Sequence, residues 1–206
     1  MEVTRLPLLS DQACLDWSCR VLLLRRHWTR RHPVVPFFTL GRAAYLDRNK
    51  GSHDSQDANR LLRRHFGDLL EAARAGLARH LGQPTELVDT QAALPGFHIY
   101  QPHPAFGLPV ASLHCDLQHR DAFPQYLDPV PPLLTFTLPI SLPPEAGLTV
   151  MEGEDARFLP YREGEMVIHD GQSPHRAVLA CTGMCDERIT LQGHGLFVDH
   201  RWLLYW

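Results

Sequence analysis

Two histidines and one aspartate stand at spacings that suit a metal site. His114 and Asp116 form a His-x-Asp pair where the local pattern predicts the end of a strand. Side chains two positions apart on a strand point to the same face, so both could reach one ion. His175 lies about sixty residues downstream, after a predicted strand and turn, and opens a further strand. Two imidazoles and one carboxylate leave coordination positions open, which is the arrangement found in non-haem iron(II) oxygenases.

A cation that suits a carboxylate follows the second histidine. Arg188 stands thirteen residues after His175, and Arg188 and Thr190 share one face of a predicted strand. A planar guanidinium binds both oxygens of a carboxylate, and a neighbouring hydroxyl can add a hydrogen bond. The sequence therefore predicts a receptor for the far end of a dicarboxylate co-substrate. The alternative is a structural ion pair between Arg188 and Asp186 or Glu187.

The order of these motifs resembles a known enzyme family. His-x-Asp, then His-Arg-x-Val, then Arg-x-Thr is similar to the 2-oxoglutarate/Fe(II)-dependent dioxygenases, and among them to the branch that includes prolyl hydroxylases; the resemblance covers roughly residues 95–198. It implies a double-stranded β-helix core, and Fe(II) and 2-oxoglutarate as cofactors with dioxygen. The residues that it assigns to the iron are His114, Asp116 and His175, and those that it assigns to 2-oxoglutarate are Arg188, Thr190 and Tyr100.

The resemblance also bears on the reaction and the substrate. Relatives that halogenate lack the carboxylate of Asp116, so its presence favours hydroxylation of an unactivated C–H bond. The substrate is predicted only as a small metabolite, an amino acid or a peptide. The expected pocket walls are residues 37–47 and 119–132. Candidate substrate contacts are His119, Tyr126 and His194, with surface placement of His119 and core packing of His194 as the alternatives; no catalytic residue beyond the metal ligands is expected.

Two other functions are compatible with the same residues. One is a cupin-like metalloenzyme that has the same barrel but does not use 2-oxoglutarate. The other is a non-catalytic binding or sensor module that has kept a metal site. Binding of 2-oxoglutarate through Arg188 argues against the first, and its turnover to succinate excludes the second.

The elements that must position these residues suggest a mainly β, single domain over residues 1–206. Residues 1–90 are predicted to be a helical support, with one helix from Ser10 to about Arg31 and another from Ser55 or Asp57 to Leu81, capped by Gly82. Residues 91–200 are predicted to be the catalytic core, a jelly roll with the helices packed on one sheet. Its expected strands are Phe97–Gln101, Pro109–His114, Leu133–Ile140, Leu148–Met151, Met166–His169, Arg176–Ala180 and Arg188–Phe197.

Composition narrows the setting of the protein. A formal net charge of −3 gives no sign of a nucleic-acid partner, and no signal peptide or membrane-spanning run is visible, so we expect a cytoplasmic location. The five cysteines are expected to be free thiols. The basic run 25–32 is predicted to be a solvated helix face with Trp28 packed inward. The apolar tail 202–206 should pack back on the domain or on a second subunit, which leaves a homodimer open.

Overall fold

The computed structural model describes residues 3–43, 45–47 and 52–206. Its helices are α1 (Asp11–Leu23), α2 (Ser52–Leu81) and α3 (His119–Ala122), with short 3-10 turns at Arg25–His27, Pro104–Gly107 and Pro124–Tyr126. Its strands are β1 (Thr4–Pro7), β2 (Thr29–Arg30), β3 (Phe37–Leu40), β4 (Thr85–Leu87), β5 (Gly96–Tyr100), β6 (Leu133–Ser141), β7 (Gly147–Glu152), β8 (Asp155–Pro160), β9 (Glu165–His169), β10 (His175–Val178), β11 (Arg188–Val198) and β12 (Arg201–Tyr205).

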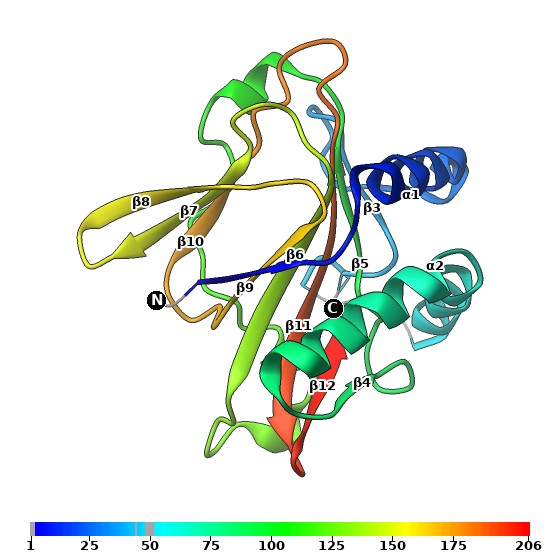
Figure 1. The fold of residues 1–206 in the computed structure, drawn as a ribbon, viewed down its shortest axis with the longest axis vertical. Helices are drawn as coiled ribbons and strands as arrows, with labels where there is room; N and C mark the ends of the chain where they lie inside the picture. The colour runs from blue at the N-terminus through cyan, green and yellow to red at the C-terminus, as the bar shows by residue number, and fades with distance from the viewer. Residues whose placement is uncertain (1–2, 44, 48–51) are drawn as a thin grey trace.

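The strands form one large and one small sheet. The large sheet has the order β1-β9-β6-β11-β5-β3-β2, with β12 paired to β11 and β4, and the small sheet has the order β10-β7-β8. Apart from the parallel pair of β12 and β4, the pairings are antiparallel. Leu148 and Val150 on β7 pack against Val167 on β9, so the small sheet lies against the large one (Figure 1). This two-sheet arrangement confirms the predicted jelly-roll core.

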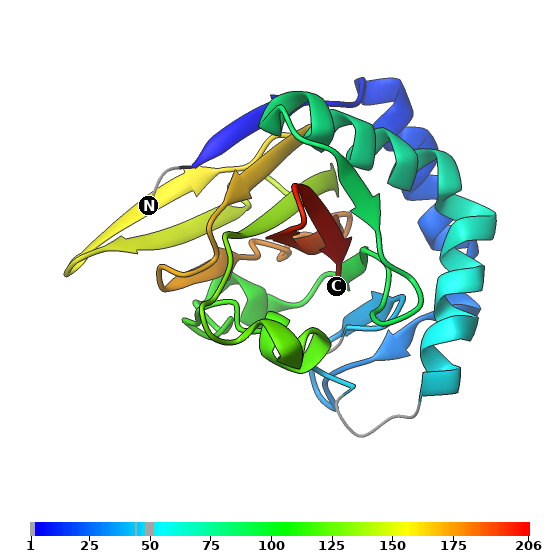
Figure 2. The ribbon, with the colours of Figure 1, turned by 90° about the horizontal axis from the view of Figure 1, so that it is seen from below.

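The two long helices cover the outer face of the large sheet, as Figure 2 shows. Strand residues alternate between faces, and the outward residues of β6 and β11 are apolar, including Phe136, Leu138, Ile189 and Leu191. They join one buried cluster with the inner side of α2, which contributes Phe66, Leu69, Leu70 and Leu77. Burial of each such side chain stabilises the fold by roughly 1.5–3 kcal/mol, so this layer fixes the sheet that carries the site.

Several inward residues of the same two strands are polar. Thr135 and Thr137 on β6 stand opposite His194 and Gln192 on β11. Further along β11, the inward series continues through Thr190 to Arg188, which stands opposite Tyr100 on β5. Regular alternation has thus given one sheet an apolar face toward the helices and a polar face toward the small sheet.

Helix boundaries agree with the predictions in part. Ser10 caps α1, because its hydroxyl accepts a hydrogen bond from the Ala13 N–H at 3.3 Å. The prediction that this helix continues to Arg31 was wrong: it ends at Leu23, and the basic run contributes a 3-10 turn and β2 instead. Trp28 does pack inward, where its indole N–H donates to the Val21 carbonyl. Gly82 follows α2 with a φ of +64°, as a capping glycine should.

Two predictions about strands need correction. Residues 1–90 are not only helical, since β1, β2, β3 and β4 from this region join the large sheet. Pro109–His114 is not a strand; His114 only forms an isolated bridge to His175. Strands β8 and β12 were not predicted. The apolar tail packs on its own chain, because β12 pairs with β11 and Trp206 is buried.

Two further features bear on the expectations from composition. Cys14, Cys19, Cys115, Cys181 and Cys185 are all free thiols, as predicted. In the part of the chain that the structure describes, no helix combines the length and the apolar character that a bilayer crossing requires.

Candidate metal centre

Backbone hydrogen bonds bring the three candidate ligands together. The His114 N–H donates to the His175 carbonyl at 3.0 Å, and the His175 N–H donates back to the His114 carbonyl at 2.9 Å. The Asp116 N–H donates to the carbonyl of Gly171 at 2.8 Å. The segment that carries His-x-Asp is therefore tied at two points to the turn and strand that carry His175. His175 opens β10, as its predicted position required.

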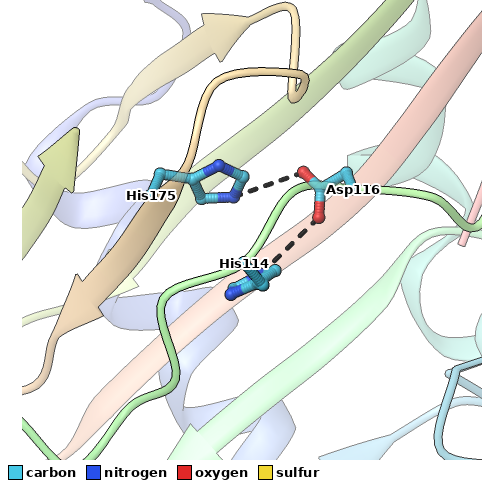
Figure 3. A group of neighbouring side chains, drawn as sticks. All are labelled: His114, Asp116 and His175. Carbon is cyan, nitrogen blue, oxygen red and sulfur yellow. Dashed lines mark ion pairs between the residues drawn. The ribbon is translucent and has the colours of Figure 1, made fainter. Parts of the chain in front are cut away.

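The side chains of the three residues converge, as Figure 3 shows. Nε2 of His114 lies 3.6 Å from Oδ1 of Asp116, and Nε2 of His175 lies 3.4 Å from Oδ2. One donor atom from each residue lies within 4.8 Å of the other two. Donors that each stand about 2.1 Å from one ion fit this separation. Two imidazoles and one carboxylate on one side of an ion leave its other side open.

The histidine rings present the correct nitrogen to a metal. Nδ1 of His114 lies 2.9 Å from the carbonyl of Ser112, and Nδ1 of His175 lies 2.9 Å from the carbonyl of Ser173. A carbonyl oxygen can only accept, so Nδ1 carries the hydrogen in both rings. The Nε2 lone pairs are then directed to the cluster. Such a hydrogen bond from the second ring nitrogen is the usual support of a metal-bound histidine.

Electrostatics favour the ionised carboxylate. Burial opposes ionisation of Asp116, but the hydrogen bond and charge of His175, the charge of His194 and the Thr135 hydroxyl outweigh it and hold the pKa of Asp116 well below its usual range. Burial alone would lower the pKa of His175, yet Asp116 raises it above the ordinary value. The protein thus holds a negative group between imidazoles, where a cation can replace a proton.

Arg188 lies on the polar inner face of the large sheet, and no described residue forms an ion pair with it. Its side chain is 1% exposed, and its guanidinium stands 5.6 Å from the Tyr100 ring and 5.7 Å from the Tyr161 ring. Its Nε and the Thr190 hydroxyl are buried without hydrogen-bond partners among the described residues. A buried cation without a counter-ion is costly, so this cluster indicates a site for an anionic ligand.

The alternative role for Arg188, a structural ion pair, is absent from the described part of the chain. Asp186 instead accepts a hydrogen bond from the Gly183 N–H at 2.6 Å and closes the loop that precedes β11. That loop connects β10 to β11.

Other residues of the inner face were missed by sequence analysis. The Tyr45 hydroxyl lies 2.7 Å from Nε2 of His98, and burial lowers the pKa of His98 far below its ordinary value. Tyr161 follows β8, and burial raises the pKa of its hydroxyl, which bonds to Thr137. Phe37 stacks on Tyr100 with ring centroids 4.5 Å apart. Phe37 and Tyr45, from the predicted pocket wall 37–47, therefore contact His98 and Tyr100 on the inner face; residue 44 lies outside the described residues.

The three candidate substrate residues have different positions. The alternative placement of His119 at the surface is wrong, because this residue of α3 is 3% exposed. His119 and His194 line a cavity of about 10 Å³ beside Asp116, room for one water molecule. Tyr126 packs against the cluster of Phe123 and Tyr205 rather than toward the metal ligands. His194 bonds to Thr135, which contacts Asp116.

His169 and Asp170 also lie close to the site but are not part of the ligand cluster. His169 faces His175 with ring centroids 4.8 Å apart, and burial lowers its pKa to about 4. Its Nδ1 accepts from the Gly171 N–H at 3.0 Å, while Asp170 accepts from the Gln172 N–H. His169 thus lies on the inner face of the sheet, while Asp170 lies in the turn that follows β9. Neighbouring residues of a strand point to opposite faces, so this difference is expected.

Comparison with known proteins gives matches in structure only. No protein-family model matches the chain, and no curated protein matches its sequence. An N-substituted L-amino acid dioxygenase from Burkholderia ambifaria, in complex with α-ketoglutarate, matches with a TM-score of 0.60 at 14% identity, over 99% of this chain and 86% of the other. AviO1 from Streptomyces viridochromogenes matches with a TM-score of 0.56 at 12% identity, over 96% and 90%.

A third match extends the range of chemistry on this fold. The non-haem α-ketoglutarate-dependent epimerase SnoN from nogalamycin biosynthesis matches with a TM-score of 0.52 at 13% identity, over 94% of this chain and 79% of the other. The chain therefore has the double-stranded β-helix fold of solved α-ketoglutarate-dependent oxygenases, as its motifs predicted.

Proposed function

We propose that the protein is an Fe(II)- and 2-oxoglutarate-dependent oxygenase that hydroxylates an unactivated C–H bond of a small metabolite, an amino acid or a peptide. One observation carries the proposal. A His-Asp-His cluster and a buried guanidinium that has no ion pair with any described residue belong to one fold, and a polar strand face connects their surroundings. An ion and an acidic co-substrate would satisfy both features.

The three ligands would hold Fe(II) on one side and leave its other side for 2-oxoglutarate and dioxygen. When bound, these groups supply the oxidising power that breaks a C–H bond. The chain itself orients the imidazoles through the carbonyls of Ser112 and Ser173, and it keeps Asp116 ionised. Carboxylate, imidazole and water are ligands that iron(II) accepts.

The co-substrate would be held through its distal carboxylate. Arg188 offers a fork of N–H donors, and Thr190 offers a hydroxyl on the same face of β11. Tyr100 and Tyr161 hold the guanidinium between their rings, which restricts its orientation without neutralising its charge. The planar fork of the guanidinium can bind both oxygens of such a carboxylate.

The structural neighbours support a small-molecule substrate. One neighbour is described as an N-substituted L-amino acid dioxygenase and another as an epimerase. The presence of Asp116 favours hydroxylation in this chain, but the fold also supports other oxidative outcomes. The substrate therefore has to be found with a panel that includes amino acids, N-substituted amino acids and short peptides.

The test is succinate formation from 2-oxoglutarate with added Fe(II), alone and with the substrate panel. The wild type is expected to release succinate, and Asp116→Ala is expected to abolish this release. Arg188→Gln should raise the KM for 2-oxoglutarate by about 10–100-fold, the loss of one charge-assisted contact of 1.5–3 kcal/mol. Arg157→Ala on the exposed strand β8 is the matched control and should leave both parameters unchanged.

The outcomes separate the rival functions. Metal binding without 2-oxoglutarate binding would indicate a cupin-like metalloenzyme. Binding of both without any succinate would indicate a sensor module. Equal turnover by wild type and Asp116→Ala would contradict the proposed ligand set.

A further inference from the structure

We propose that Thr135 and His194 form a hydrogen-bond relay that positions the Asp116 carboxylate for the metal. The relay rests on the proposed function, because its purpose is to orient a metal ligand. The Thr135 hydroxyl donates to Oδ2 of Asp116 at 2.6 Å. Nδ1 of His194 lies 3.1 Å from the same hydroxyl. The exposed fractions of the three residues are 6%, 7% and 7%, so bulk solvent has little access to these contacts.

The direction of each hydrogen bond follows from the number of protons available. A metal-binding carboxylate is deprotonated and can only accept. Thr135 has one hydroxyl proton, which it gives to Asp116. The contact with His194 must then have the imidazole as donor, which fixes the proton of that ring on Nδ1. The result is a one-way chain from His194 through Thr135 to Asp116.

The sheet supplies the geometry of this chain. Thr135 stands opposite His194 on β11 and opposite His169 on β9, so it lies at the centre of three adjacent strands. Its place in the strand is fixed by the packing of Phe136 and Leu134 on the other face. The hydroxyl is therefore held by the most buried part of the fold rather than by a loop.

The turn that follows β9 has a glycine where a side chain would collide with the relay. Gly171 has a φ of +69°, and a Cβ at this position would come within 2.5 Å of the Thr135 hydroxyl and 3.0 Å of Asp116. Gln118 completes the arrangement by donating from Nε2 to Oδ1 of Asp116 at 3.3 Å. Both carboxylate oxygens thus accept a hydrogen bond, so rotation of the carboxylate would break contacts at either end.

The experiment measures metal binding rather than turnover. Co(II) is titrated into the metal-free protein by calorimetry, and its visible absorption band reports the coordination. Thr135→Val removes the hydroxyl at constant shape and is expected to weaken binding by about 10–100-fold, the range for such supporting contacts. Thr135→Ser keeps the hydroxyl and should restore binding and the wild-type absorption band.

Two variants test the outer half of the relay. His194→Leu removes the donor, and His194→Asn keeps an N–H near the position of Nδ1. We expect His194→Leu to weaken Co(II) binding by about tenfold, at the lower end of the same range, and His194→Asn to recover most of it. Because His194 acts through Thr135, the double variant with Thr135→Val and His194→Leu should bind no more weakly than Thr135→Val alone.

The results distinguish the relay from the metal site itself. A wild type that does not bind Co(II) would overturn both proposals. Wild-type affinity in Thr135→Val, or an equal loss in Thr135→Ser, would overturn the relay and leave the metal site intact. Additive losses in the double variant would show that His194 does not act through Thr135. Thermal unfolding of each variant is the control that checks whether the fold is retained.

Discussion

The two faces of the large sheet differ in the polarity of their side chains. The outer face of β6 and β11 is apolar and packs on α2, while the inner face of the same strands carries threonine, glutamine, histidine and arginine. Stability and chemistry are thus encoded in alternate residues. A substitution on the outer face of these strands should therefore affect mainly folding, and one on the inner face should affect mainly ligand binding.

The largest effect on stability is expected at Phe136, on the outer face. Phe136→Ala removes a fully buried ring and leaves a cavity, which should lower the free energy of unfolding by about 3–5 kcal/mol. Urea denaturation measures this loss. Its inner-face neighbour provides the comparison: Thr137→Val should change stability far less, and an equal loss at both positions would contradict the separation of roles.

Acid should weaken the inner face rather than the outer one. The pKa of His169 is lowered from 6.5 to about 4 by burial, so the unfolded chain binds more protons than the folded one between these values. Stability should therefore fall as pH falls from 6.5 toward 4, by up to about 3 kcal/mol from this group. The comparison is the pH dependence of unfolding in His169→Phe with a chelator present, which should be flatter than that of the wild type.

Gly171 tests the point where the inner face meets a turn. Gly171→Ala should cost about 2 kcal/mol or more, because of its positive φ and its contacts with Thr135 and Asp116. Gly153 has a similar φ of +68° with no atom near its Cβ position, so Gly153→Ala measures the backbone cost alone. Only the change at Gly171 should weaken Co(II) binding. A loss of binding in both variants would mean that the close contacts at Gly171 are irrelevant.

The smallest effect, and one of opposite sign, is expected at Arg188. Replacing a buried and unpaired cation by Arg188→Met should stabilise the ligand-free protein by about 1 kcal/mol while it abolishes high-affinity binding of 2-oxoglutarate. Thermal unfolding with and without 2-oxoglutarate measures both effects. A destabilised variant would show that Arg188 serves mainly to hold the inner face together.

The candidate site was predictable where it depended on residue types, and less so where it depended on strand pairing. His114, Asp116 and His175 are adjacent in space as the motif predicted, although the first two do not lie on a strand. Arg188 was identified from the Arg-x-Thr motif that follows His175 in the sequence. Thr135 was missed because it reaches the site through the register of β6, β9 and β11, which no local pattern specifies. Tyr161 was missed because it lies in the connection between β8 and β9.

The fold shows the same limit. The helix α2 and the core strands were predictable because each has a strong apolar period, as in Leu133–Ser141. Strands β1 and β2 are four and two residues long and are defined by the edges to which they pair. His119 was placed wrongly because α3 is a single turn whose burial depends on its neighbours rather than on its own sequence.

The paired backbone bonds between His114 and His175 have a consequence for how a metal ion would be loaded under the proposed function. Folding alone brings these distant segments side by side. The entropy cost of closing the chain between His114 and His175 is therefore met by folding and does not reduce the affinity for an ion. Stripping the ion with a chelator should then leave a folded chain that can be reloaded, unlike a zinc finger, which unfolds when its ion is lost. The fold therefore arranges the ligand residues in advance, and the ion is not needed to hold the fold together.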